Sequence, residues 1–166
     1  MKSILIFFIL SSALHSTVYS QQAVTTFILT RHAEKGDDGT KDPDLTPAGI
    51  QRAQLLAKLL TETKVDAIFS TAYKRTQNTV APLAKAKELV VKAYEPFKTE
   101  ELDKMLREYA GGTVVICGHS NNIPSIANYL IGREDYKTFE DADYDNLMIV
   151  TVVERGKTTK VTWLNY

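Results

Sequence analysis

Two histidines stand where an imidazole could act on a ligand. The chain has three histidines, and both His32 and His119 come directly after a short apolar, β-branched run. Such runs are typical of buried strands, and open α/β sheets bind their ligands beyond the carboxyl ends of the strands. An imidazole in that place can be a nucleophile or can carry a proton. These observations leave open which of the two histidines would be the nucleophile.

Two arginines could bring positive charge to the same place. Arg31 directly precedes His32, and Arg75 lies on the first turn of a helix predicted to follow the strand at 65–70. A guanidinium offers forked donors that match a phosphoryl group, and a helix N-terminus favours an anion. Taken singly, Arg31 could be a solvated turn residue and Arg75 a surface cation. Beside two histidines, they favour a site for a phosphorylated ligand.

These side chains need a framework that brings strand ends together. Apolar runs alternate with segments of helical periodicity, which predicts a three-layer αβα sandwich around a mostly parallel central sheet with right-handed crossovers. The four candidate side chains all follow strand ends, so they should converge at one carboxyl edge. The expected strands cover residues 27–30, 65–70, 88–93, 113–117, 145–153 and 160–164, and the expected helices begin at Pro47, near Arg75, after Thr99 and near Ile123.

Three motifs, in this order, resemble those of the histidine phosphatase superfamily, which has the phosphoglycerate-mutase-like fold. Arg31–Glu34 resembles that family's Arg-His-Gly-Glu signature, Ser70–Thr79 its second arginine motif, and Gly118–Ser120 its second histidine motif. Three motifs in order, each in the expected strand or helix context, are a specific signal. The resemblance extends from about Thr25 to the C-terminus. The chain is similar in size to the family's short members, such as bacterial phosphohistidine phosphatases.

The resemblance implies a role for each of these residues. According to the resemblance, His32 is the nucleophile and would form a phosphohistidine. Arg31 and Arg75 would bind the phosphoryl oxygens. His119 would stabilise the charge of the transition state, and water would then release phosphate. No metal or other cofactor is expected, because arginines and a histidine supply the cations. The expected ligand is a small phosphorylated substrate or a phosphopeptide.

The general acid is less well marked. Larger members of the family carry a carboxylate beyond the third strand, and Glu95 holds the corresponding place here. Glu100 and Glu101 are alternatives, although charge stabilisation at a helix start explains them too. A short member can also lack a dedicated acid, which would suit good leaving groups.

The first 20 residues resemble a secretory signal peptide. Lys2 supplies a positive start, Ile4–Leu10 form an apolar run, and Val18–Ser20 offer small residues at the cleavage positions. The apolar run is shorter than a typical membrane span, although an uncleaved anchor is the alternative. We therefore expect cleavage near Ser20, export to the periplasm or the medium, and no stable membrane anchor.

Composition narrows the possible partners of the remaining domain, residues 21–166. The chain has 20 basic and 20 acidic residues, which gives no reason to expect nucleic acid or an anionic membrane as a partner. The acidic loop Gly36–Asp44 lacks the ligand spacing of a calcium loop, so we expect it to be a solvent-exposed loop. The single cysteine, Cys117, can form no intrachain disulfide and is expected to be a core residue.

These observations predict an exported, metal-independent phosphatase. A mutase or phosphotransferase is disfavoured, because the chain lacks the length for a lid that keeps water from phosphohistidine. A non-catalytic module that binds phosphorylated ligands is the other alternative, and two departures bear on it. One is the uncertain acid, and the other is Ala33, which stands where the family usually has glycine. We expect this extra methyl group to tune activity and not to abolish it.

Overall fold

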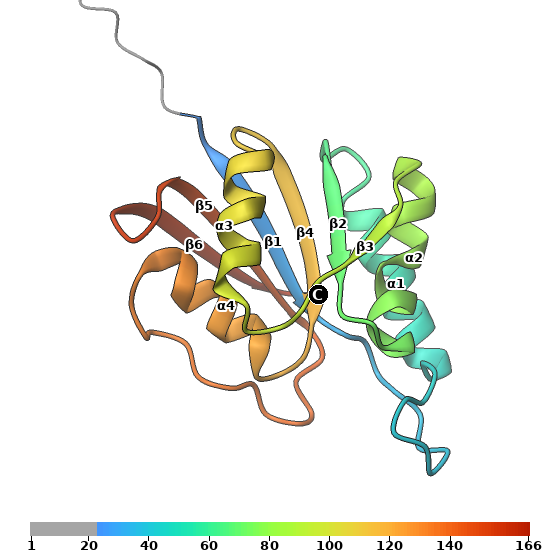
Figure 1. Ribbon diagram of the computed structural model, residues 1–166. Helices are drawn as coiled ribbons and strands as arrows, with labels where there is room; N and C mark the ends of the chain where they lie inside the picture. The colour runs from blue at the N-terminus through green and yellow to red at the C-terminus, as the bar shows by residue number, and fades with distance from the viewer. Residues whose placement is uncertain (1–22) are drawn as a thin grey trace, which may run out of the picture.

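Six strands form one sheet in the part of the chain that the computed structural model describes, residues 23–166 (Figure 1). The order is β3-β2-β4-β1-β5-β6, in which the first four strands pair in parallel, and the β1–β5 and β5–β6 pairs are antiparallel. The predicted mostly parallel sheet is therefore confirmed. The strands are β1 Thr25–Arg31, β2 Ala67–Ser70, β3 Val91–Ala93, β4 Thr113–Gly118, β5 Asn146–Glu154 and β6 Thr158–Asn165.

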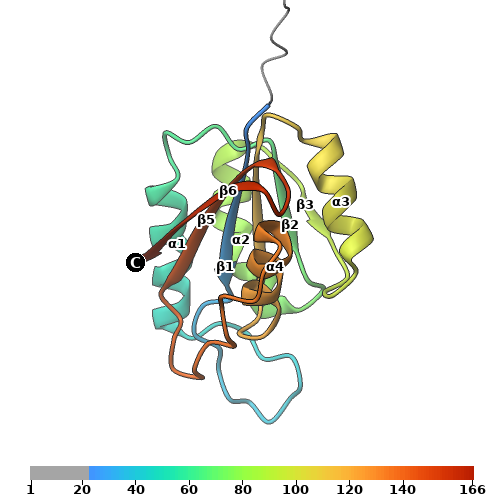
Figure 2. The ribbon, with the colours of Figure 1, turned by 90° about the vertical axis from the view of Figure 1, so that its left-hand side faces the viewer.

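Helices cover both faces of the sheet, as the αβα prediction requires (Figures 1 and 2). Alternate residues of β1 point to opposite faces. Phe27 and Leu29 pack into the core beneath α3 and α4, and Ile28 packs into the core beneath α1 and α2. The helices described in residues 23–166 are α1 Pro47–Leu59, α2 Lys74–Lys87, α3 Thr99–Glu108 and α4 Asn122–Ile131.

The start of α1 follows from its sequence. The hydroxyl of Thr46 accepts a hydrogen bond from the Gly49 N–H at 3.1 Å, and Pro47 occupies the first helical position. Gly49 allows a close approach at this point. A Cβ there would lie 2.3 Å from the carbonyl oxygen of Glu34. The helix start is thereby pressed against the segment that follows β1.

The third strand is shorter than predicted. The sequence suggests a strand at 88–93, whereas β3 covers only Val91–Ala93. The difference arises because Glu88 adopts a left-handed conformation, with φ at 55°, and ends α2. Leu89 then donates its N–H to the carbonyl of Ala84 at 2.9 Å. Residues 88–90 therefore complete the helix end and do not join the sheet.

Two further expectations concern the chain as a whole. The expected signal peptide, Met1–Ser20, lies outside the described residues. Between residues 23 and 166, none of the helices has the length and apolar character needed to cross a bilayer. Cys117 is fully buried in β4, and burial raises the pKa of its thiol, so it behaves as a core residue.

Candidate active site

The adjacency of β1 and β4 places the two histidines side by side. In the parallel register of these strands Arg31 is level with Gly118, so His32 and His119 leave the sheet at neighbouring points. The His32 N–H donates to the Gly118 carbonyl at 2.9 Å. The two imidazole rings lie 5.4 Å apart between centroids. One phosphoryl group is small enough to contact both rings.

His32 presents a neutral nitrogen toward this edge. The ring is buried, and its Nδ1 lies 2.8 Å from the carbonyl oxygen of Ala33. Because a carbonyl only accepts, Nδ1 carries the hydrogen and Nε2 keeps its lone pair. Burial, aided by the positive charges of Arg31, His119 and Arg75, lowers the pKa of His32 to about 3. The imidazole is therefore uncharged and nucleophilic at any ordinary pH.

His119 is held by three neighbours. Its Nε2 lies 3.0 Å from the hydroxyl of Thr71, and its backbone N–H donates to Oδ1 of Asn122 at 2.7 Å. The ring of Tyr73 meets the His119 ring edge-on, with centroids 5.1 Å apart. Burial and the charges of Arg75 and Arg31 lower the pKa of His119 to about 4. A bound phosphoryl dianion acts in the opposite direction and favours the charged imidazolium.

Arg31 is fixed by a distant segment of the chain. Its Nη1 donates to the backbone carbonyls of Glu140, Asp141 and Asp143, at 2.8, 3.2 and 3.0 Å. The guanidinium also stacks on Tyr144, 4.3 Å from the ring centroid. The side chain is buried, and within the described part of the chain its Nε has no hydrogen-bond partner. The guanidinium thus remains able to donate to an anion.

Arg75 is held less tightly, by one carboxylate, one ring and a 3.4 Å hydrogen bond from its Nη1 to the carbonyl of Lys41. Its Nη1 lies 3.5 Å from Oδ1 of Asp42, and its guanidinium stacks on Tyr73 at 4.2 Å. Asp42 also accepts a hydrogen bond from the N–H of Lys74, the first residue of α2, at 3.0 Å. The acidic loop is therefore not merely solvated, because Asp42 occupies the N-terminus of this helix. The Asp42 carboxylate lies where the dipole of α2 and the charge of Arg75 both favour an anion.

The residues after His32 are tied to the two helices on the same face. The N–H of Ala33 donates to the hydroxyl of Thr79 in α2 at 2.9 Å, and the Ala33 side chain is fully buried. Glu34 forms an ion pair with Arg52 of α1 at 2.7 Å. The hydrogen bonds from Arg52 lower the pKa of Glu34. These contacts fix the backbone that carries the His32 ring.

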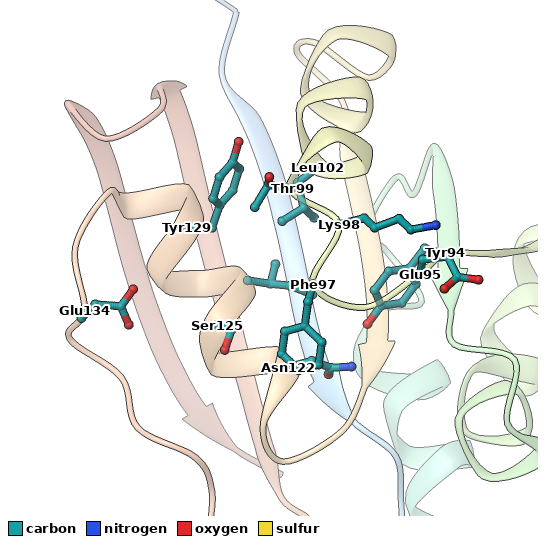
Figure 3. Close-up of a pocket in the computed structure, with 11 residues that line it drawn as sticks. Tyr94, Glu95, Phe97, Lys98, Thr99, Leu102, Asn122, Ser125, Tyr129 and Glu134 are labelled. Carbon is teal, nitrogen blue, oxygen red and sulfur yellow. The ribbon is translucent and has the colours of Figure 1, made fainter.

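Glu95 lies on the exposed turn after β3. Its backbone N–H donates to the carboxylate of Glu101 at 2.9 Å, which gives Glu101 a role in shaping the turn. The close-up in Figure 3 shows the carboxylate of Glu95 directed away from Asn122, the residue that contacts His119. Glu100, also exposed, lies in the first turn of α3. The structure thus brings Arg31, Arg75 and the two histidines together, and the acid stays a prediction.

Several residues that contact the two histidines or the arginines were not among the site residues predicted from the sequence. Thr71 and Tyr73 lie inside the second arginine motif, so the motif could have suggested them. Tyr144 contacts Arg31 from a loop that matches none of the three motifs. The sequence indicates for Asn122 only a position next to the helix expected near Ile123. Its contact with His119 depends on the tight turn that follows β4.

This arrangement suits transfer of a phosphoryl group. A neutral imidazole nitrogen can attack phosphorus, and two guanidinium groups and a second imidazole can surround the oxygens. Among residues 23–166 there is no cluster of three or more histidine, cysteine, aspartate or glutamate side chains placed to hold a metal ion.

Comparisons with known proteins agree with this chemistry. The family model of the histidine phosphatase superfamily, branch 1, matches residues 27–98. Phosphoserine phosphatase 1 of Hydrogenobacter thermophilus is 41% identical over 70 residues, which are 39% of this chain and 33% of that protein. The chain thus aligns with about a third of the length of the curated relative it matches.

Solved structures show the same fold at low sequence identity. The protein histidine phosphatase SixA complexed with tungstate has a TM-score of 0.68 at 13% identity, covering 84% of this chain and 96% of its own. A mycobacterial glucosyl-3-phosphoglycerate phosphatase has a TM-score of 0.65 at 13% identity, covering 86% and 99%. A mutant phosphoserine phosphatase from Entamoeba histolytica, solved with phosphoserine, has a TM-score of 0.65 at 18% identity, covering 83% and 95%.

Proposed function

We propose that this chain, which belongs to the histidine phosphatase superfamily, hydrolyses phosphomonoesters without a metal, through a phosphohistidine on His32. The observation that carries the proposal is the pair of neutral imidazoles, 5.4 Å apart and flanked by two arginines. The substrate is a phosphorylated small molecule or a phosphopeptide.

The first step uses the lone pair of His32 Nε2. It attacks phosphorus in line with the ester oxygen, a nitrogen–phosphorus bond forms, and the phosphorus–oxygen bond breaks. The ring then carries positive charge, which the carbonyl of Ala33 stabilises by accepting from Nδ1 at 2.8 Å. The departing oxygen takes a proton, for which Glu95 is the candidate donor.

The second step returns the enzyme to its starting state. Water attacks phosphorus, loses a proton and displaces the His32 nitrogen, so that inorganic phosphate leaves. In both steps negative charge develops on the equatorial oxygens of the phosphoryl group. Arg31, Arg75 and His119 surround that position. Because Arg31 is fixed by three carbonyls and Tyr144, little reorganisation is needed when the charge develops.

Export is part of the proposal. It is supported by the charge at Lys2, the apolar run Ile4–Leu10 and the small residues before Gln21. A protein outside the cytoplasm would meet phosphorylated nutrients or peptides there and not the usual cytoplasmic phosphoproteins.

The test is hydrolysis of para-nitrophenyl phosphate by the chain that begins at Gln21, with EDTA present. We expect turnover that survives EDTA and falls at least about a thousandfold in His32→Ala, because the nucleophile is lost. Lys64→Ala is the matched control, since the side chain of Lys64 is 88% exposed and forms an ion pair with Asp66 at the surface.

Each outcome bears on the proposal. Loss of turnover with EDTA, restored by a divalent cation, would contradict the metal-free mechanism. Full activity in His32→Ala would contradict the assignment of the nucleophile. Phosphate binding by a folded protein that turns over no ester, from acidic to neutral pH, would favour the binding module instead.

A further inference from the structure

We propose that the cavity between the β3–α3 connection and α4 receives the organic part of the substrate, and that this part is apolar or aromatic. The inference rests on the proposed phosphatase function, which it extends to a substrate class. The cavity measures about 210 Å³, and its walls include Tyr94, Phe97, Leu102, Ile126 and Tyr129 (Figure 3). An apolar cavity of about 150 Å³ is enough to bind benzene, so this one accommodates a single ring.

The cavity begins at the histidine edge. Asn122 lines it, and the Oδ1 of the same residue accepts the His119 N–H at 2.7 Å. Tyr94 lines it too, and both side chains pack against Gly118. A Cβ on Gly118 would lie 2.7 Å from the Tyr94 hydroxyl and 2.2 Å from the Asn122 Oδ1. Asn122 thus contacts His119 and also forms part of the cavity wall, so the organic part of an ester whose phosphate is held by the histidines lies next to the cavity.

Two unpaired donors sit at this inner end. The Tyr94 hydroxyl and the Asn122 amide nitrogen have no hydrogen-bond partner within residues 23–166, although these residues are only 6% and 1% exposed. In Figure 3 the Tyr94 hydroxyl and the Asn122 amide lie at the same end of the cavity. Burial raises the pKa of Tyr94, so its hydroxyl keeps its proton and remains a donor. Unpaired buried donors are rare in folded proteins, and an oxygen of a bound ester would satisfy these two.

The charges on the walls of the cavity disfavour a leaving group that carries a second negatively charged group. Lys98 is the one cation on its walls in the described part of the chain, whereas Glu95 and Glu134 supply two carboxylates. Glu134 already accepts a hydrogen bond from the amide of Asn128 at 2.9 Å. A second carboxylate or phosphate on the substrate would need more positive charge than this.

Phe97 marks the mouth of the cavity. Its side chain is 63% exposed, and its backbone has φ at 70°, in the left-handed region that a bulky residue rarely adopts. Such strained conformations persist only where the surrounding structure holds them in place, and they are frequent at ligand-binding sites. A ring bound in the cavity would cover this exposed aromatic surface and gain from its packing.

The test uses two esters whose leaving alcohols have similar acidity, phenethyl phosphate and ethyl phosphate. We expect wild-type kcat/KM to favour the phenethyl ester by about tenfold or more, through a lower KM, because the ring fills the cavity. Phe97→Ala should reduce this preference about fivefold. Val90→Ala is the matched control, since Val90 is 81% exposed and does not line the cavity.

A second variant tests the inner end. Tyr94→Phe removes a hydroxyl that has no partner, so it should leave the melting temperature unchanged or higher while lowering kcat/KM about tenfold. A merely structural role of the hydroxyl predicts the reverse, a lower melting temperature with unchanged kcat/KM.

The outcomes separate this inference from the phosphatase proposal. Equal hydrolysis of both esters, with no change of ratio in Phe97→Ala, would overturn the inference and leave the phosphatase standing. If neither ester is hydrolysed, the cavity is tested by titrating 2-phenylethanol and following chemical shifts, and the phosphatase proposal fails only if para-nitrophenyl phosphate is not hydrolysed either. Binding that Phe97→Ala weakens about fivefold would then support the cavity as a ring site, and absence of binding would overturn it.

Discussion

At the scale of single residues, the site depends on two imidazoles that stay neutral. Burial and neighbouring positive charge lower the pKa of His32 to about 3 and that of His119 to about 4, from an ordinary value of 6.5. A neutral nucleophile is ready for attack, so the enzyme does not depend on a change of pH to activate it. Acidity bears instead on the stability of the fold.

Stability should fall in acid because of these histidines. Both folded pKa values lie below the unfolded value, so between about pH 6.5 and pH 3 the unfolded chain binds more protons than the folded one. We expect the melting temperature to decrease as the pH falls through this window. In His32→Asn the decrease should be smaller, and equal pH dependence in both proteins would contradict the assignment.

The ring of Tyr144 should matter more than its hydroxyl. It stacks on Arg31 at 4.3 Å, and its centroid lies 5.9 Å from that of His32. Tyr144→Ala should lower kcat/KM for para-nitrophenyl phosphate about tenfold, because the stacking that orients the guanidinium is lost. Tyr144→Phe keeps the ring and should retain most of the activity. Similar losses in both variants would point to the hydroxyl instead.

At the scale of elements, the start of α2 places a carboxylate beside Arg75, the arginine proposed to bind the phosphoryl group. Asp42 accepts from the first N–H of the helix and lies 3.5 Å from Arg75. Both contacts are ones that a phosphoryl oxygen could also make. The loop at 36–44 therefore both caps the helix and competes with an anionic ligand for Arg75.

Asp42→Asn separates these two effects. Asparagine caps helices about as well as aspartate, so the melting temperature should change little. Removal of the negative charge should tighten inhibition by inorganic phosphate about two- to fivefold, because Arg75 loses its competing partner. Inhibition constants from steady-state kinetics measure this effect. Weaker inhibition by phosphate in the variant would contradict the competition.

The motifs allowed more of the site to be predicted than of its surroundings. His32 and His119 follow strands that are apolar and β-branched, and a parallel sheet brings such strand ends together. The contacts of Arg31 could not be predicted in this way. They are made by backbone carbonyls at 140–143, which carry no residue-type signal and lie more than 100 positions along the chain.

Boundaries of elements depended on local conformation that residue types only weakly encode. The third strand begins at Val91 and not at Glu88, because Glu88 takes the left-handed conformation that glycine usually supplies at a helix end. The role of Asp42 could not be predicted either, because its contact is with a helix that begins 32 residues later, and an acidic loop by itself indicates only a solvated segment.

At the scale of the whole molecule, the proposed catalytic site and the proposed substrate cavity lie next to each other at one edge of the sheet. β1 and β4 bring the histidines together, while α4 and the β3–α3 connection form the cavity beside them (Figures 1 and 3).

The proposed export predicts that an N-terminal segment is removed, so that the mature enzyme lacks it. N-terminal sequencing of the exported protein should begin at Gln21, and a start at Met1 in a membrane fraction would favour the uncleaved anchor.

The central claim is the covalent intermediate on His32, and the most direct measurement is to trap it. The enzyme would be mixed with phosphate-labelled para-nitrophenyl phosphate and quenched in alkali within milliseconds, because phosphohistidine is stable there and labile in acid. Peptide mass spectrometry should locate the label on the peptide that contains His32, with no label in His32→Ala. Label on His119 instead would contradict the account, as would rapid turnover with no labelled peptide at any quench time.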